Sequence, residues 1–197
     1  LMLFYGNNPL TLIREIHRTH KIEMLATLRQ RVEALLLAGL RSSADVPWFM
    51  GVMAETGRSL FQRLEVLCRE SMGPPPAPYN ILLTGSLGRR ESLTRTDFTG
   101  LLLYDDSVGK ENGWFIELLQ RMTSAACQIG FAPPRHTIFP QTGDCCRSFS
   151  EWVSFYESLI ADPIRQEIWR RLILLDLSAL HYDNSLCEDL QARIQQS

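Results

Sequence analysis

Residues 79–106 constrain the fold of this chain most strongly, because two short apolar runs lie there on either side of a glycine-containing turn. The runs are Ile81–Thr84 and Phe98–Tyr104. Each is flanked by turn residues and is too short for a stable helix, so both are predicted to be buried strands. A short sheet of this kind needs helices to cover it, and the rest of the chain is expected to supply them.

The segment between the two runs, Gly85-Ser86-Leu87-Gly88, predicts a tight turn at the start of a short helix. Gly85 and Gly88 tolerate positive φ angles and leave no Cβ in the way of a ligand. Ser86 offers a hydroxyl beside the backbone N–H groups of the helix start. A backbone corner of this composition suits a phosphate group.

Arg89 and Arg90 follow the turn, and the sequence leaves two interpretations of their charge. In the first, they attract the phosphate that the turn would hold. In the second, they form surface ion pairs, since the acidic Glu91 is their immediate neighbour. The local pattern favours neither interpretation over the other.

Asp97 stands eleven positions after Ser86, where the second strand is expected to start. Residues 97 and 99 of a strand project from the same face, so carboxylates at both positions would form an oxygen site for a divalent cation. Position 99 is Thr99, whose neutral hydroxyl offsets a divalent charge less than a carboxylate does. Asp105 lies about 26 Å further along an extended strand, outside a shared coordination sphere. Asp144 is an alternative only if its segment folds back toward the motif.

Seven residues of this stretch together resemble the signature of the DNA polymerase beta-like nucleotidyltransferase superfamily: Gly85, Ser86, Gly88, Arg89, Glu91, Thr96 and Asp97. Within that superfamily the segment is most similar to the nucleotidyltransferase domains that follow paired CBS domains in bacterial signalling proteins. Those domains are relatives of the uridylyltransferase that modifies the PII nitrogen-signalling protein. The similarity extends to the helical regions before and after the motif, so it covers nearly the whole chain.

The resemblance implies an α+β fold in three parts. These are an N-terminal helical unit (1–72), a small mixed β-sheet nucleotidyltransferase-like domain (79–145) and a C-terminal helical, substrate-binding-like region (146–197). The residues themselves support the first boundary, because the prolines between Met72 and Pro78 are incompatible with a helix.

The resemblance also implies a function, the transfer of a nucleoside monophosphate from a nucleoside triphosphate (NTP). Five residues would hold the phosphates of the nucleotide: Gly85, Ser86, Gly88, Arg89 and Arg90. Asp97 would be the catalytic acid and a ligand of Mg²⁺, with Thr99 as a weak second ligand. Three further residues would support them: Glu91, Thr96 and Asp176.

Departures from the family pattern predict weak or lost activity. Thr99 replaces the second acid of the metal motif. Arg135-His136-Thr137 stands where the family has Cys-Pro-Gly, and Ser178 stands where an arginine is expected. Three functions therefore remain open: an active nucleotidyltransferase, a nucleotide-binding sensor without turnover, and a scaffold for dimerisation or partner docking.

Apolar residues at helical intervals predict helices over 11–19, 23–40, 47–68, 114–129, 148–160, 164–180 and 186–194, and a third strand over 136–139. Ser42 and Ser43 are candidate caps of the third helix. Asp176 would lie within an apolar helix, where a carboxylate needs a partner. That partner is either the site at the Gly-Ser turn or a neighbouring arginine, Arg170 or Arg171.

Composition excludes two classes of partner. The 197 residues are 45% hydrophobic, enough for a proper core, and their formal net charge of −2 gives no basic field for nucleic acid. No apolar run approaches the roughly 20 residues of a membrane span, and no signal peptide is visible. Five cysteines without a framework spacing favour free thiols in a reducing cytoplasm.

The expected partners follow from the resemblance. They are a nucleotide, an acceptor that is a protein or a small molecule, and upstream CBS or other sensory domains, with a homodimer as a further expectation. The chain starts without an initiator methionine, which predicts that it is cut from a longer protein.

Overall fold

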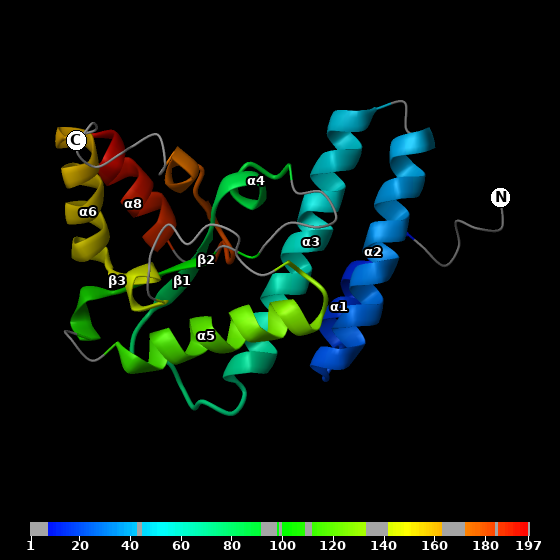
Figure 1. Cartoon of the computed structure of the whole chain (residues 1–197), viewed down its shortest axis with the longest axis horizontal. Coiled ribbons are helices and arrows are strands. Elements are labelled where there is room, and N and C mark those ends of the chain that lie inside the picture. The colour runs from blue at the N-terminus through cyan, green and yellow to red at the C-terminus, as the bar shows by residue number, and fades with distance from the viewer. Residues whose placement is uncertain are drawn as a thin grey trace.

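A small sheet at the centre of the molecule separates two groups of helices (Figure 1). The computed structural model describes residues 8–42, 45–91, 98, 100–108, 112–132, 142–162, 172–183 and 185–196. The helices are α1 (Pro9–Arg18), α2 (Ile22–Ser42), α3 (Val46–Arg69), α4 (Gly85–Gly88), α5 (Gly113–Gln128), α6 (Phe149–Ala161) and α8 (Leu186–Gln195), with 3₁₀ turns η2 (Asp106–Val108), η3 (Thr142–Cys145) and η4 (Leu172–Leu175). The strands are β1 (Tyr79–Leu83), β2 (Gly100–Tyr104), β3 (Cys146–Ser148) and β4 (Ser178–Ala179). The predicted α+β class is confirmed.

The sheet is mixed, with the strand order β3-β2-β1-β4. β1 pairs antiparallel with both β2 and β4, and Leu82 lies opposite Leu101 in the first of these pairs. β2 pairs parallel with β3. The two strands expected from the apolar runs are therefore the two central strands of the sheet.

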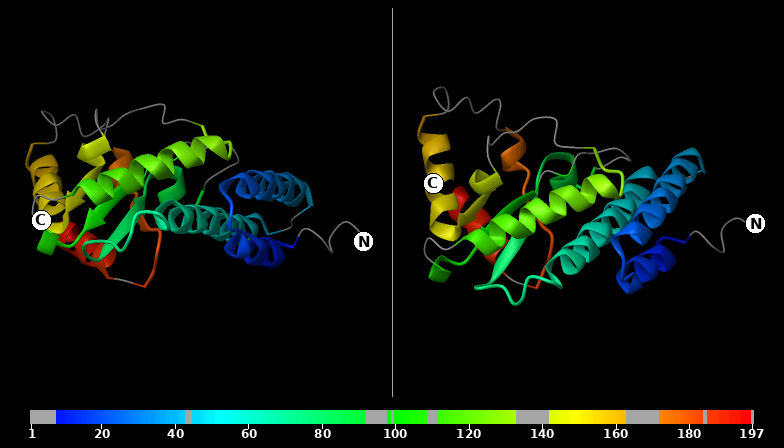
Figure 2. Two further views of the ribbon diagram at one scale, coloured as in Figure 1. Left: turned by 90° about the horizontal axis from the view of Figure 1, so that it is seen from below. Right: turned by 60° about the horizontal axis from the view of Figure 1, so that its bottom comes forward.

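Both faces of the central strands are buried, which explains why their sequences do not alternate with polar residues. Successive side chains of a strand point to opposite faces. One face packs against α3 and α5 through Ile81, Leu83, Leu102 and Tyr104. The other packs against α6 and α8 through Leu82, Leu101 and Leu103. Figure 2 shows α5 lying across the sheet, with α1, α2 and α3 bundled beside it. In the described part of the chain, no helix has both the length and the apolar character that crossing a membrane requires.

Helix starts follow local side-chain chemistry. Asp45, not Ser42 or Ser43, caps α3, since its carboxylate accepts a hydrogen bond from Trp48 N at 3.0 Å. Ser42 is the last residue of α2, and Ser43 lies outside the described residues. Pro47 falls in the first turn of α3, as predicted.

The C-terminal half departs from the prediction in part. The strand expected over 136–139 lies outside the described residues, and the structure contains a strand, β3, which begins at Cys146 and was not predicted. The prediction of a helix that reaches Leu180 is wrong over its last part. Residues 172–175 form a 3₁₀ turn, and residues 178–179 pair with β1. Tertiary pairing overrides helical periodicity there.

The core continues across the proline-rich segment. Phe61 on α3 stacks on Phe98, directly before β2, at a centroid distance of 5.0 Å, and it packs against Phe131 after α5 at 4.7 Å. These residues, except the partly buried Phe131, belong to one buried cluster with β1 and α1. Helix α3 therefore packs directly against the sheet domain. The domain boundary at residue 72 stays a prediction, although the hydrophobic core continues across it.

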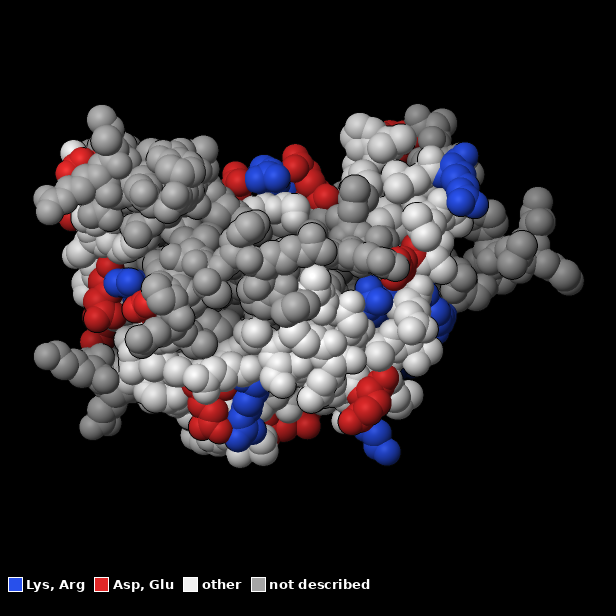
Figure 3. All heavy atoms as spheres, in the orientation of Figure 1, with Lys and Arg blue, Asp and Glu red and all other residues white. Residues whose placement is uncertain are grey.

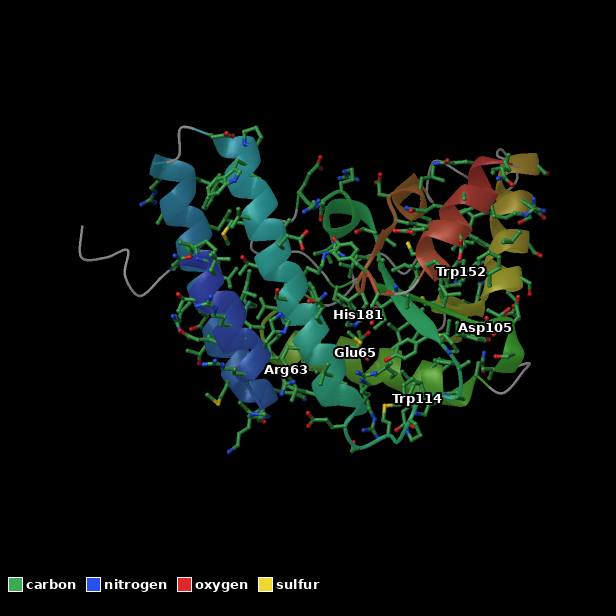
Figure 4. The ribbon with its side chains drawn as sticks, turned by 180° about the vertical axis from the view of Figure 1, so that it is seen from behind. Arg63, Glu65, Asp105, Trp114, Trp152 and His181 are labelled. Atoms are coloured by element: carbon green, nitrogen blue, oxygen red, sulfur yellow. The ribbon has the colours of Figure 1, made fainter. Side chains whose placement is uncertain are left out.

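Helix α3 also holds the segment that contains β4. Gln62 Nε2 donates to Leu180 O at 2.8 Å. Glu65, which is almost completely buried, has its Oε2 3.5 Å from His181 Nε2, and the two side chains lie side by side in Figure 4. On the other side, Asn80 of β1 donates to His181 O at 2.8 Å. Residues 178–182 are thus wedged between α3 and β1.

Gly57→Ala is expected to raise the free energy of unfolding by about 0.5–1 kcal/mol, because alanine is the better residue inside a helix. An added Cβ at this α3 position meets no heavy atom within 4 Å. Urea denaturation measures the change. Gly39→Ala in α2 should have the opposite effect, since the added Cβ would overlap the ring of Phe49. For this variant we expect the free energy of unfolding to fall by about 1–3 kcal/mol. A lower free energy of unfolding in Gly57→Ala would contradict the absence of neighbouring atoms around this position.

Candidate functional site

The predicted turn lies at the end of the central strand β1. Thr84 is extended, and Gly85 takes a φ of 59°, the left-handed region that favours glycine. The chain then closes one turn of helix, with Arg89 N donating to Gly85 O and Glu91 N donating to Ser86 O, both at 2.8 Å. The turn and the short helix expected from the sequence are therefore confirmed, and Gly85 makes the corner.

Gly88 serves a different purpose from the one predicted. Unlike Gly85, Gly88 does not have a positive φ. A Cβ at this position would lie 2.8 Å from both Leu83 O and the carbonyl carbon of Asp176, and closer still to Asp176 O. Gly88 therefore lets the backbone of the C-terminal segment approach the turn. Gly88 does not use the positive φ that a glycine tolerates, and its missing Cβ makes room for protein backbone.

Arg89 joins two acidic residues. Its Nε lies 2.9 Å from Glu91 Oε2, and its Nη1 lies 2.5 Å from Asp176 Oδ2. The hydrogen bonds to Glu91 and then Asp176 raise the pKa of the Arg89 guanidinium above its usual value. Asp176 thus contacts the turn, which was one of its two expected positions. Arg170 and Arg171 lie outside the described residues.

Arg90 is held by the N-terminal helical region. It has a φ of 61°, which is uncommon for a residue with a side chain. Its Nη2 lies 2.5 Å from Oε1 of Glu55 on α3. The surface-pairing interpretation therefore describes both arginines of the turn in this structure, although Glu91 pairs only with Arg89.

Both arginines remain open to solvent, so an incoming anion can reach them. The side chains of Arg89 and Arg90 are 46% and 51% exposed. At the upper edge of the molecule, over α4, basic atoms have acidic atoms on both sides (Figure 3). Exposed ion pairs contribute at most about 1 kcal/mol each. A phosphate group can therefore compete with these carboxylates for the arginines.

Several predicted residues have no described position. Thr96, Asp97 and Thr99 lie outside the described residues, so their distances from the turn are not part of this structure. Ser86 lies in α4 and is partly exposed. The predicted catalytic acid and metal ligands consequently stay predictions, whereas the turn and Asp176 have places in the site.

The described residues contain no set of ligands for a two-metal site. In the described part of the chain, no group of three or more His, Cys, Asp or Glu side chains is placed to hold a metal ion. The metal motif itself supplies one carboxylate, Asp97, and the neutral hydroxyl of Thr99. Two-metal phosphoryl-transfer sites need several anionic oxygens to bridge their ions. Binding of Mg²⁺ at this motif therefore stays a prediction.

A cavity lies behind the turn, between α2 and α3, and Leu83, Leu87, Arg58 and Arg90 are among the residues that line it. Its volume is about 50 Å³. Ligand pockets are usually about 300–1,000 Å³, so a nucleotide does not fit inside. A nucleotide at this turn would lie on its open side.

The contacts of Glu55 and Tyr182 at the turn were not predicted from the sequence. Glu55 approaches Arg58 with i,i+3 spacing on α3, a signal that the sequence contained. Its contact with Arg90 and the 3.5 Å hydrogen bond from Tyr182 Oη had no such signal, because they join distant parts of the chain.

The fold and the turn together place this chain in the class of nucleotidyltransferase-like α+β domains. Residues 30–166, well over half of the chain, match the family described as "Putative nucleotidyltransferase DUF294", and the chain belongs to this family. The match includes α3, the turn and position 97, but ends before Asp176. A search of curated proteins gives no significant match.

The cysteines form no reactive site in the described structure. All five are free. Burial raises the pKa of Cys68, Cys145 and Cys187 to about 11 and raises that of Cys146 further still. Cys127 is exposed. Burial of Cys68, Cys146 and Cys187 and partial burial of Cys145 are typical of structural thiols.

At pH 8 we expect a thiol reagent to modify the exposed Cys127 rapidly, the partly exposed Cys145 more slowly, and the buried Cys68, Cys146 and Cys187 only after unfolding, as counted by mass spectrometry. The buried thiols stay protonated when folded but ionise near pH 9 when unfolded. The unfolded state is therefore favoured as the pH rises from about 9 to 11, and the free energy of unfolding should fall over that window. Equal labelling of all five native thiols would contradict the burial.

Gly88→Ala is expected to destabilise the protein by about 1–3 kcal/mol, because the new Cβ would push the backbone of Asp176 away from the turn. Chemical denaturation measures the loss. Gly113→Ala is the matched control, since an added Cβ there meets no heavy atom within 4 Å. A Gly88 variant as stable as this control would show that the C-terminal segment does not pack on the turn.

Proposed function

We propose that this chain binds the triphosphate of a nucleotide at the turn formed by residues 85–90 and transfers the nucleoside monophosphate to an acceptor hydroxyl. The observation that carries the proposal is the left-handed corner at Gly85, which follows the central strand directly and has two exposed arginines behind it. Exposed backbone N–H groups and guanidinium groups are what phosphate oxygens bind in proteins.

In the proposed reaction, the acceptor oxygen forms a bond to the α-phosphorus while the bond to the bridging β-phosphate oxygen breaks. Pyrophosphate leaves, and the proton of the acceptor hydroxyl passes to solvent. Family membership supports this reaction class. Asp97 is the acid of the motif that we assign to catalysis, with Thr96 and Glu91 as its supporting neighbours.

A second candidate is a sensor that binds nucleotide without turnover. Thr99 favours it, because the motif then has a single carboxylate for a cation such as Mg²⁺. The resemblance to domains that follow CBS pairs in bacterial signalling proteins suits this candidate, in which nucleotide occupancy would be read by an upstream domain. The resemblance to the PII uridylyltransferase suits the first candidate, with a protein as the acceptor.

The test combines binding and turnover. Thermal unfolding is followed with ATP, UTP, GTP or CTP, each with and without Mg²⁺, and pyrophosphate release is measured in parallel. A nucleotide at about one hundred times its dissociation constant should add about 2.7 kcal/mol to the free energy of unfolding. Absence of any shift with all four nucleotides would overturn the proposal.

Two variants separate the candidates. Asp97→Asn should keep nucleotide binding but abolish pyrophosphate release if the chain is a transferase, whereas the sensor shows no release even before substitution. Thr99→Asp should make the thermal shift more dependent on Mg²⁺, because it restores a second carboxylate. Asp105→Asn is the control, since this exposed acid lies after β2, outside the motif. An unchanged Mg²⁺ response in Thr99→Asp would count against the predicted strand register of the motif.

A further inference from the structure

One carboxylate on α3 faces the turn, a buried arginine and the C-terminal segment at the same time. Oε1 of Glu55 lies 2.5 Å from Arg90 Nη2 and accepts a 3.5 Å hydrogen bond from Tyr182 Oη. Its other oxygen, Oε2, lies 3.5 Å from Arg58 Nε. Glu55 is therefore the point at which three regions of the chain meet.

Arg58 has one unsatisfied donor beside this carboxylate. Its side chain is only 4% exposed, and its Nη2 donates to Ser178 Oγ at 2.7 Å while Nη1 donates to Ala179 O. Its Nε has no hydrogen-bond acceptor in the described part of the chain. A buried donor without a hydrogen bond is unfavourable, so an acceptor that moves into range is stabilised.

The Glu55 carboxylate can therefore take two positions, since two arginines lie beside it. In the first, which the structure contains, its carboxylate pairs with Arg90, and both of these side chains are open to solvent. In the second, it would close the 3.5 Å gap to Arg58 Nε and reach ordinary hydrogen-bond distance, about 2.7–3.2 Å. Releasing Arg90 therefore does not leave Glu55 unpaired, and it satisfies a buried donor.

We infer that Glu55 is a positioning residue that exchanges between Arg90 and Arg58, and that a polyphosphate at the turn takes Arg90 from it. This inference rests on the proposed function, because it assumes a polyphosphate at residues 85–90. Glu55 then acts as an internal competitor that lowers the affinity of the turn for phosphate. It also links occupancy of the turn to α3 and to β4, which Arg58 holds.

The size of the effect follows from the exposure of the pair. An exposed ion pair is worth up to about 1 kcal/mol, and a tenfold change in affinity corresponds to about 1.4 kcal/mol. Removing the charge of Glu55 should therefore strengthen polyphosphate binding by about two- to fivefold.

The experiment measures binding of inorganic tripolyphosphate and ATP to the full chain by isothermal titration calorimetry. Glu55→Gln should bind both about two- to fivefold more tightly than the wild type. Arg90→Gln should bind more weakly, and adding Glu55→Gln to it should give no gain, a dependence that a merely structural role of Glu55 would not produce. Glu55→Asp keeps a carboxylate next to Arg58 with a shorter reach, and it should give an intermediate affinity.

Glu33→Gln is the matched control. Glu33 lies on the neighbouring helix α2 and pairs with Arg29 at 3.4 Å, so its neutralisation should leave tripolyphosphate affinity unchanged. An equal gain in this control would reduce the effect to net charge and overturn the role of Glu55.

The remaining outcomes separate this inference from the proposed function. If the wild type binds and Glu55→Gln binds no more tightly, the exchange is overturned and the proposed function stands. If neither protein binds tripolyphosphate or ATP, both are overturned. Binding by Glu55→Gln alone would support both, because the carboxylate would then be the barrier to binding.

Discussion

The packing of the Asp176 backbone against Gly88 is the contact on which the arrangement of the site depends. A side chain at residue 88 would collide with that backbone, so the C-terminal segment reaches the turn only because glycine is there. From this contact the chain continues into β4, which pairs with β1 and accepts a hydrogen bond from Arg58 of α3. One close approach thereby ties the turn, the sheet and the N-terminal helices together.

The charged side chains of the site are paired with one another. Each arginine of the turn faces a carboxylate from a different region, Asp176 for Arg89 and Glu55 for Arg90. The turn is therefore close to neutral when empty, which agrees with the absence of a basic field in the composition. Because these pairs are exposed and individually weak, an anion of higher charge can replace them. Polyphosphate binding, as proposed, would rearrange ion pairs with carboxylates from α3 and from the C-terminal segment.

Membership of the nucleotidyltransferase family and the replacement of an acid by Thr99 point in different directions. In the proposed function the turn would recognise phosphate, whereas the carboxylates would determine how a cation assists transfer. A chain can keep the first and weaken the second, since the turn is a property of the backbone and position 99 is a single side chain. Binding and turnover are therefore separate questions for this protein.

Local patterns were sufficient for β1, β2, the helices α1 to α3, α5 and α6, and the turn at Gly85, because apolar periodicity and glycine act within a few residues. They were insufficient for β3 and β4. These strands have three and two residues and are stabilised by their partners, so a helical pattern before Leu180 misled the prediction. The family, the α+β class and the turn with its arginines follow from the order of the residues. The approach of the Asp176 backbone to Gly88 and the pairing of Glu55 with Arg90 arise from the folded chain, because both contacts join residues far apart in the sequence, whose approach no local spacing encodes.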